Sequence, residues 1–309
     1  MRAYTERIVF TPSADQRAQA GVLMRPTEGS ARPTGIVCIH GSPGFFYFPM
    51  YVSLGRALAE RGIRFVSGNT RGHDAAALDF PWPYSFRPED RAKWRVGGSS
   101  FVRWDEEPHD VAGWINFLVA QGAEQIVLFG HSAGAIRVLY YQAERQDPRV
   151  VGLILASGSD RVPAIDPARL ELAQRLVAEG QEDALLPVPE GGPLVAGMES
   201  AANVVHLDRI VGRFAAEGHA PWIASIRVPV LATHGTVDWN TDLPARLEAM
   251  RGRAVRAPRF DIQVIEGADH CYTGHDQEFA EVVARWLEAL PVAKGTAKRR
   301  WWGGRQRSR

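Results

Sequence analysis

Residues 130–134 read Gly-His-Ser-Ala-Gly and place Ser132 between two glycines. The apolar run 126–129 precedes this pentapeptide, and apolar residues at helical spacing follow it. The sequence therefore predicts a strand, a tight turn and a helix, with Ser132 on the turn. Such a turn projects the serine hydroxyl away from the sheet, and only glycines fit where its neighbours approach the backbone. Ser132 is our candidate nucleophile.

A serine hydroxyl needs an adjacent general base, which is itself oriented by a third group. Of the nine histidines, His270 has the best placement, because it lies in a loop directly after the last predicted strand. His275 is its nearest competitor but falls where the final helix begins. We expect His131 to point away from Ser132 by the geometry of the turn, and His40 to belong to another loop.

The acid that orients the base is predicted to be Asp238, which follows the strand predicted at 228–232. Asp160 is its rival, because it follows the preceding strand and could reach the same histidine. Asp242 and Asp269 are local alternatives that are more typical of helix caps and loop turns.

Acyl transfer also needs two N–H donors that face the developing oxyanion. Ala133, which follows Ser132 at the start of its helix, should supply one of them. The second should come from the loop 40–44, where Pro43 is excluded because it has no N–H. Ser42 is our choice, with Gly41 or Gly44 as the alternatives.

The elements that must position these residues alternate along the chain. Apolar, β-branched runs predict a hairpin at 8–10 and 21–24, then strands at 36–39, 64–67, 126–129, 151–155, 228–232 and 260–264. Amphipathic runs predict helices near 50–60, 108–120, 133–144, 241–250 and 278–290. This order is typical of an α/β fold with a mostly parallel sheet flanked by helices.

Two segments interrupt the alternation. Residues 74–104 are dense in aromatic side chains and predict a packed excursion over one edge of the site; the rings are Phe80, Trp82, Tyr84, Phe86, Trp94, Phe101 and Trp104. Residues 161–225 contain helical runs broken by Pro and Gly, which predicts an inserted helical cap. The core would then comprise 1–160 and 226–290.

Charge and composition limit the partners. The chain has a net formal charge of +1, but Lys294 to Arg309 contain seven basic and no acidic side chains. Without these seven charges, the rest of the chain carries a formal net charge of −6. We expect 291–309 to be a basic disordered tail, and we do not expect it to bind nucleic acid, because nothing else in the chain supports that role. No apolar run is long enough for a membrane span or a secretory signal.

Only two cysteines are present, Cys38 and Cys271. This count predicts neither a disulfide framework nor a zinc site, and favours a reducing, cytoplasmic setting. The sequence implies no metal and no organic cofactor.

Four motifs follow one another along the chain: His40-Gly41-x-Pro43-Gly44, Gly130-x-Ser132-x-Gly134, Gly235-x-x-Asp238 and Gly267-Ala268-Asp269-His270. In them the chain resembles the α/β-hydrolase superfamily over nearly its whole length. The resemblance implies that fold, with Ser132, Asp238 and His270 as its triad. Residues 69–74 and the aromatic excursion look like a branch that includes siderophore-ester hydrolases.

The expected function is hydrolysis of a carboxylic ester, thioester or lactone through an acyl-enzyme. Acyl transfer on the same triad and slow-turnover ligand binding are the alternatives. A substrate with an apolar body is expected, because aromatic residues follow the oxyanion loop at 45–51 and recur at 82–86. The sequence leaves the oligomeric state open.

Overall fold

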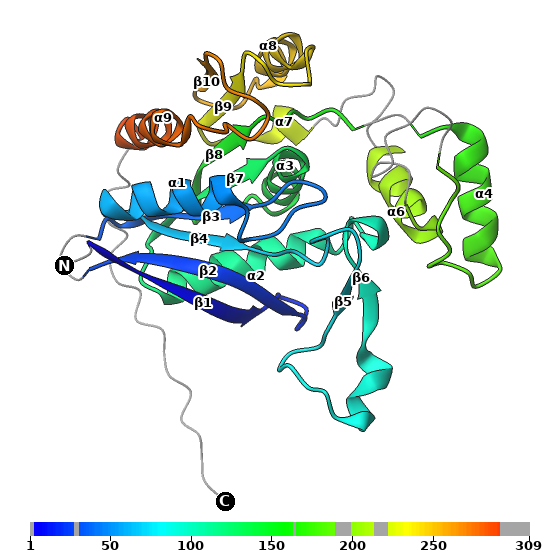
Figure 1. Cartoon of the computed structure of the whole chain (residues 1–309). Coiled ribbons are helices and arrows are strands. Elements are labelled where there is room, and N and C mark those ends of the chain that lie inside the picture. Colours follow the sequence, from blue (N-terminus) through cyan, green and yellow to red (C-terminus); the bar gives the residue numbers. More distant parts are fainter. Residues whose placement is uncertain (1–2, 28–30, 163–164, 189–198, 213–221, 291–309) are drawn as a thin grey trace, which may run out of the picture.

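The structure is a computed structural model that describes residues 3–27, 31–162, 165–188, 199–212 and 222–290. Its central sheet has eight strands in the order β1-β2-β4-β3-β7-β8-β9-β10 (Figure 1). The strands are β1 (Tyr4–Pro12), β2 (Ala18–Pro26), β3 (Thr34–Ile39), β4 (Arg64–Gly68), β7 (Gln125–His131), β8 (Val150–Ala156), β9 (Val230–Gly235) and β10 (Phe260–Ile265). The hairpin β1–β2 is antiparallel, β2 pairs antiparallel with β4, and the remaining pairs are parallel. The predicted mostly parallel sheet is confirmed.

The register of the parallel strands brings the predicted site residues to one edge of the sheet. Ile39 at the end of β3 is opposite Gly130 of β7, and His131 is opposite Ala156 of β8. Because parallel strands end at the same edge, the loops that follow β3, β7, β8, β9 and β10 adjoin there.

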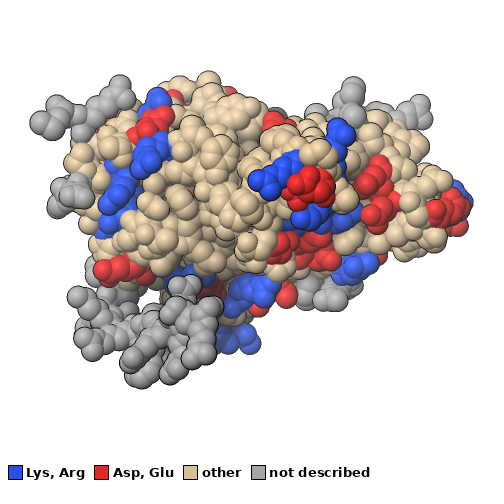
Figure 2. Space-filling model, turned by 90° about the horizontal axis from the view of Figure 1, so that it is seen from below, with Lys and Arg blue, Asp and Glu red and all other residues tan. Residues whose placement is uncertain are grey.

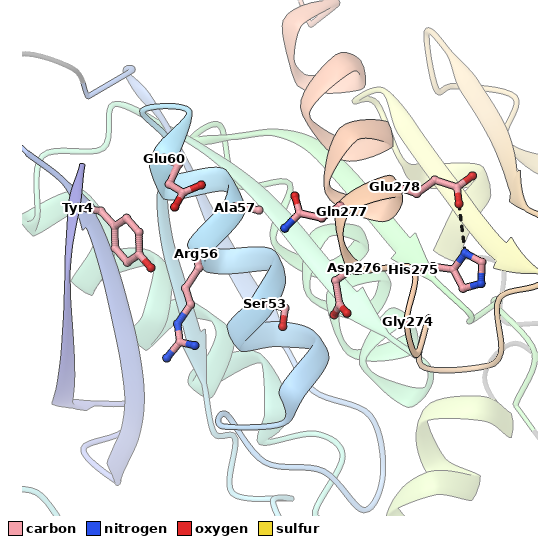
Figure 3. A pocket seen from close by; sticks show the side chains of 10 residues that line it. All are labelled: Tyr4, Ser53, Arg56, Ala57, Glu60, Gly274, His275, Asp276, Gln277 and Glu278. Carbon is pink, nitrogen blue, oxygen red and sulfur yellow. Dashed lines mark hydrogen bonds and ion pairs between the residues drawn. The ribbon is translucent and has the colours of Figure 1, made fainter. Parts of the chain in front are cut away.

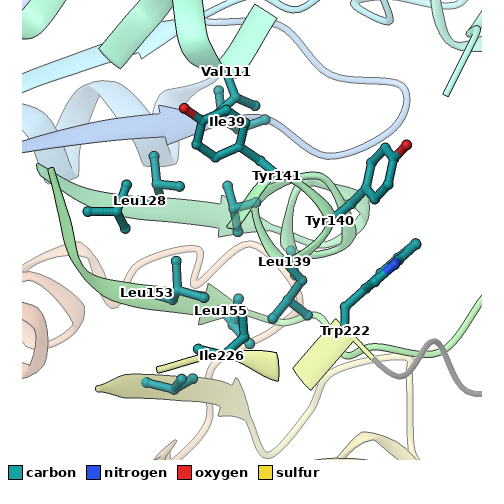
Figure 4. Close-up of a cluster of buried hydrophobic side chains, with 14 of the residues drawn as sticks. Ile39, Val111, Leu128, Leu139, Tyr140, Tyr141, Leu153, Leu155, Trp222 and Ile226 are labelled. Carbon is teal, nitrogen blue, oxygen red and sulfur yellow. The ribbon is translucent and has the colours of Figure 1, made fainter. Parts of the chain in front are cut away.

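Helices cover both faces of the sheet, as the nearly continuous burial of its central strands β3, β7 and β8 requires. α1 (Pro49–Glu60) and α9 (Asp276–Glu288) pack on one face, with Leu58 and Phe279 in the same buried cluster. α2 (Glu107–Ala120), α3 (Ala133–Arg145) and α8 (Leu243–Arg253) cover the other face. Figure 4 shows part of this second cluster, in which Leu128 and Leu153 of the sheet lie on the side that faces Leu139 of α3.

A helical insertion follows β8, within the range expected for the cap. α4 (Pro167–Ala178) and α6 (Ala201–Gly212) pack on each other beside the sheet (Figure 1). α7 (Trp222–Ser225) falls in the expected cap range but packs on α3, where the Trp222 and Tyr140 ring centroids are 5.0 Å apart (Figure 4). Trp222 and Ile223 thus belong to the main core cluster.

The aromatic excursion forms an arm that carries β5 (Ala77–Asp79), β6 (Arg95–Gly97) and the short 3-10 helices η1 (Pro88–Lys93) and η2 (Ser99–Phe101). Its rings pack on one another, and Tyr84 contacts Phe10 of β1 edge to face, with centroids 5.9 Å apart. The Ala18 N–H donates to the Phe80 carbonyl over 2.8 Å. Phe80, Tyr84, Phe86 and Trp94 therefore pack at the turn of the β1–β2 hairpin and not over the site, contrary to the prediction for these rings. Trp104 differs from them, because its ring packs on the core and faces Arg137 at 5.4 Å.

Ion pairs join the arm to the core. Asp79 of the arm accepts from Arg17 over 2.9 Å and from Arg95 over 2.5 Å, and Arg95 also pairs with Glu106. Acidic and basic side chains lie next to one another on the face seen from below (Figure 2).

In the part of the chain described, no helix is long and apolar enough to cross a membrane. The basic tail predicted at 291–309 lies outside the described residues.

Candidate active site

Ser132 lies on a strained turn between β7 and α3, as predicted. Its φ of 53° and ψ of −121° are a conformation that a residue with a side chain rarely adopts. A Cβ at Gly130 would meet the Gly134 carbonyl oxygen at 2.3 Å, and a Cβ at Gly134 would meet the Ile39 carbonyl oxygen at 2.3 Å. The two glycines therefore permit the close approach that holds Ser132 in this conformation.

His270 and Asp238 contact each other across the loops after β10 and β9. His270 Nδ1 is 2.9 Å from Asp238 Oδ2 and 3.0 Å from Oδ1, and both side chains are largely buried. The Asn240 N–H also donates to Asp238 Oδ1, over 2.8 Å. Burial alone would raise the pKa of Asp238, but the hydrogen bonds from His270 and Asn240 outweigh it and hold that pKa below its ordinary value. Asp238 is thus the ionised partner of His270.

The rival carboxylates have other partners. Both oxygens of Asp160 accept from Arg253 Nη2, over 2.9 and 2.8 Å, although Asp160 is only 1% exposed. Asp242 pairs with Arg161 and Arg246. Asp269 accepts from the N–H groups of Cys271 and Thr273, and so shapes the loop of His270.

His275 is likewise engaged elsewhere. It precedes α9, and its Nδ1 lies 3.1 Å from Glu278 Oε2. His275 is among the residues that line a groove of about 620 Å³ between α1 and α9, and its ring is turned toward Glu278 (Figure 3). None of Ser132, Asp238 and His270 lines this groove.

The loop after β3 lies against the nucleophile. A Cβ at Gly41 would be 3.0 Å from Ser132 Cβ. The Gly41 N–H donates to the Tyr51 hydroxyl over 3.1 Å, so Gly41 is not available as an oxyanion donor. Among the described residues, the N–H groups of Ser42 and Ala133 donate no hydrogen bond, which leaves both predicted donors unengaged.

The peptide between Gly41 and Ser42 is held in one orientation. The Gly41 carbonyl accepts from His40 Nδ1 over 2.7 Å, while His40 Nε2 accepts from the Thr70 N–H over 3.1 Å. In a trans peptide the C=O and the next N–H point in opposite directions. The Ser42 N–H therefore points away from His40.

Sequence reasoning missed a buried ion pair beneath this loop. Arg137 Nε is 2.9 Å from Glu107 Oε2, and Arg137 Nη1 donates to the His40 carbonyl over 3.0 Å. Both side chains are essentially inaccessible to solvent. Burial raises the pKa of Glu107, and the charge of Arg137 acts in the opposite direction. No motif in the sequence marks this pairing, because Glu107 and Arg137 lie in two different helices.

We expect Arg137→Met to destabilise the protein by about 3–5 kcal/mol, since it leaves the Glu107 carboxylate buried without its partner. The loss is measured as the free energy of unfolding in denaturant. Arg149→Met is the matched control, because Arg149 pairs with Asp147 but is 37% exposed in its side chain and should lose much less. Equal losses in the two variants would contradict the expectation.

Among the described residues, no hydrogen bond reaches Ser132 Oγ. Contacts between nucleophile and base often tighten only with substrate bound. No group of three or more His, Cys, Asp or Glu side chains in the described ranges could hold a metal ion.

Residues 36–282 match the alpha/beta hydrolase family, and the chain belongs to that family. A search of curated protein sequences gives no match.

Solved structures of two esterases and of a dienelactone hydrolase share the fold. Est1E from Butyrivibrio proteoclasticus, in a structure with ferulic acid bound, is 18% identical with a TM-score of 0.61 over 91% of this chain and 99% of that one. The Pyrococcus furiosus esterase Pf2001 is 13% identical with a TM-score of 0.60, over 93% and 92%. Dienelactone hydrolase from Anabaena variabilis ATCC 29413 is 18% identical with a TM-score of 0.52, over 93% and 99%.

Proposed function

We propose that the chain is a serine hydrolase that cleaves carboxylic esters through an acyl-enzyme. The observation that carries the proposal is the His270–Asp238 contact at the sheet edge where Ser132 lies on its strained turn. A nucleophile, a base and an orienting carboxylate in three adjoining loops can perform acyl transfer.

In the proposed reaction, His270 Nε2 takes the proton of Ser132 Oγ as that oxygen attacks the ester carbonyl carbon. The Ser42 and Ala133 N–H groups stabilise the oxyanion. The tetrahedral intermediate then expels the alcohol, which takes the proton from His270. Water then attacks the acyl-enzyme by the same steps, which releases the acid and restores Ser132. Thioesters and lactones would react by the same steps.

We also propose that the substrate has an apolar body. Trp239 follows Asp238 directly, is 71% exposed, and its ring centroid lies 4.8 Å from that of His270. Val237 is exposed on the same loop. Large apolar side chains that remain in water beside a base offer a surface to an apolar ligand.

Trp239→Ala should lower kcat/KM for a long-chain or aryl ester about three- to tenfold, because an aromatic contact contributes about 0.5–1.5 kcal/mol. The value for the acetyl ester of the same alcohol should change less. Trp239→Phe keeps a ring and should retain most of the preference. The two kcat/KM values, measured for each variant, give the ratio that decides. An unchanged ratio in Trp239→Ala would remove Trp239 from the substrate site.

The function itself is tested with a panel of esters, thioesters, lactones and amides, including a feruloyl ester and a siderophore ester. Wild-type protein should turn over esters and be labelled at Ser132 by a fluorophosphonate. Labelling without turnover would instead indicate the slow-turnover binding protein. Product analysis with an added alcohol would reveal acyl transfer in place of hydrolysis.

A further inference from the structure

Three loops of the candidate site are joined by two buried side chains that take no part in the proposed chemistry. Tyr51 of α1 is 2% exposed and His131, the last residue of β7, is 4% exposed. The Tyr51 hydroxyl accepts from the Gly41 N–H over 3.1 Å and lies 2.9 Å from His131 Nδ1. His131 Nε2 lies 2.9 Å from the backbone carbonyl of His270.

These hydrogen bonds form a series that runs from the Gly41 N–H to the His270 carbonyl. The groups at its two ends fix the direction of every hydrogen bond in the series. The His270 carbonyl can only accept, so His131 Nε2 carries the proton. Burial, followed by repulsion from His270, lowers the pKa of His131 to about 4, so the ring is neutral at pH 7 and its Nδ1 is an acceptor. The Tyr51 hydroxyl therefore donates to Nδ1 and accepts from the Gly41 N–H.

We propose that Tyr51 and His131 are positioning residues that couple the oxyanion loop, at Gly41, to the base loop, at His270. The role rests on the function proposed above. Ser132 directly follows His131, so the same two side chains set the distances between nucleophile, oxyanion donor and base. Neither of them makes a hydrogen bond to the Ser132 hydroxyl or to the His270 ring, although the His131 and His270 ring centroids lie 5.0 Å apart.

Loss of either side chain leaves buried partners without hydrogen bonds. Removal of the Tyr51 hydroxyl leaves the Gly41 N–H without an acceptor and His131 Nδ1 without a donor. The loop of Gly41 and the turn of His131 can then shift. A displacement of about 1 Å in such a site can reduce turnover about 100-fold. Because the groups that move act on the transition state, the loss should fall on kcat and leave KM nearly unchanged.

The test compares Tyr51→Phe with Tyr141→Phe in the full-length protein. Tyr141 of α3 is also 2% exposed and donates to Asp147 over 2.7 Å, so its variant loses a buried hydroxyl outside the site. We expect Tyr51→Phe to lower kcat for a short neutral ester about 10- to 100-fold with KM within about threefold. Tyr141→Phe should change kcat less than about twofold, although both variants lower the melting temperature.

His131 gives a second comparison. His131→Gln retains one acceptor and one donor and should keep more of kcat than His131→Leu, which has neither. In the wild-type protein, ¹⁵N spectra of labelled histidine should show His131 as the neutral Nε2–H tautomer at pH 7, with the resonance assigned by its absence in His131→Gln.

Equal kcat in Tyr51→Phe and Tyr141→Phe would overturn the proposal, as would equal losses in the two His131 variants or an Nδ1–H tautomer for His131. Turnover that persists in Ser132→Ala would refute the proposed function instead. The tautomer of His131 would still decide whether the coupling exists.

Discussion

Ser132→Ala is expected to reduce ester turnover by about 10⁴–10⁶, in line with triad removals in serine proteases. The change removes only the attacking oxygen, because alanine keeps the Cβ and hence the same backbone strain at φ 53°. We therefore expect the melting temperature to remain within a few degrees of the wild-type value. The hydroxyl is half-buried on its turn, and no described residue depends on it as a hydrogen-bond partner.

The measurements are kcat on a short acyl ester, covalent labelling by a fluorophosphonate, and thermal unfolding. Ser53→Ala is the matched control, because Ser53 lies on α1 and lines the groove between α1 and α9 (Figure 3). It should keep both turnover and labelling. Near wild-type turnover in purified Ser132→Ala would exclude Ser132 as the nucleophile.

The site was predictable to the extent that local sequence determines it. Two glycines flank Ser132 between an apolar strand and a helix. Few other backbone conformations are compatible with this local pattern, so it specifies the turn of Ser132. Asp238 and His270 follow two later strands, and parallel strands end at one edge of the sheet. Their contact at 2.9 Å, separated by 32 positions, agrees with that reasoning.

The aromatic arm shows where the sequence was insufficient. Its ring density indicates packing but does not say against which surface. The structure sets Phe80 beside Ala18 and Asp79 beside Arg17, pairs that are 62 positions apart. Rings and charges of this kind fit several surfaces equally well, so only the folded chain selects the β1–β2 turn.

The hydrogen-bonded chain from Gly41 to His270 was also beyond the sequence. His131 and Tyr51 are 80 positions apart, and each has a residue type that is common in ordinary cores. The role of a buried histidine depends on the hydrogen-bond partners of its two ring nitrogens, and the partners of His131 lie in other parts of the chain.

Asp238→Asn should lower kcat about 10⁴-fold, as the equivalent change does in a well-studied protease. The neutral amide can donate to His270 Nδ1 and thereby favour the tautomer that cannot accept the Ser132 proton. The pKa of Asp238 lies below its ordinary value, so its contribution to stability is present above the usual aspartate range and is lost as the pH falls through the folded-state pKa. The asparagine variant should lack that part of the pH dependence. Thermal unfolding across acidic pH measures it.

Asp160→Asn is the control that separates the two candidate acids. Asp160 is also a buried aspartate, and it follows β8, the strand next to β9. Its two oxygens bind Arg253, so we expect a loss of about 1–3 kcal/mol in the free energy of unfolding. Turnover should stay within about threefold, since His270 keeps its partner. If Asp160→Asn lost more turnover than Asp238→Asn, the acid would lie after β8. The 2.9 Å contact between His270 and Asp238 would then describe a resting arrangement that substrate rearranges.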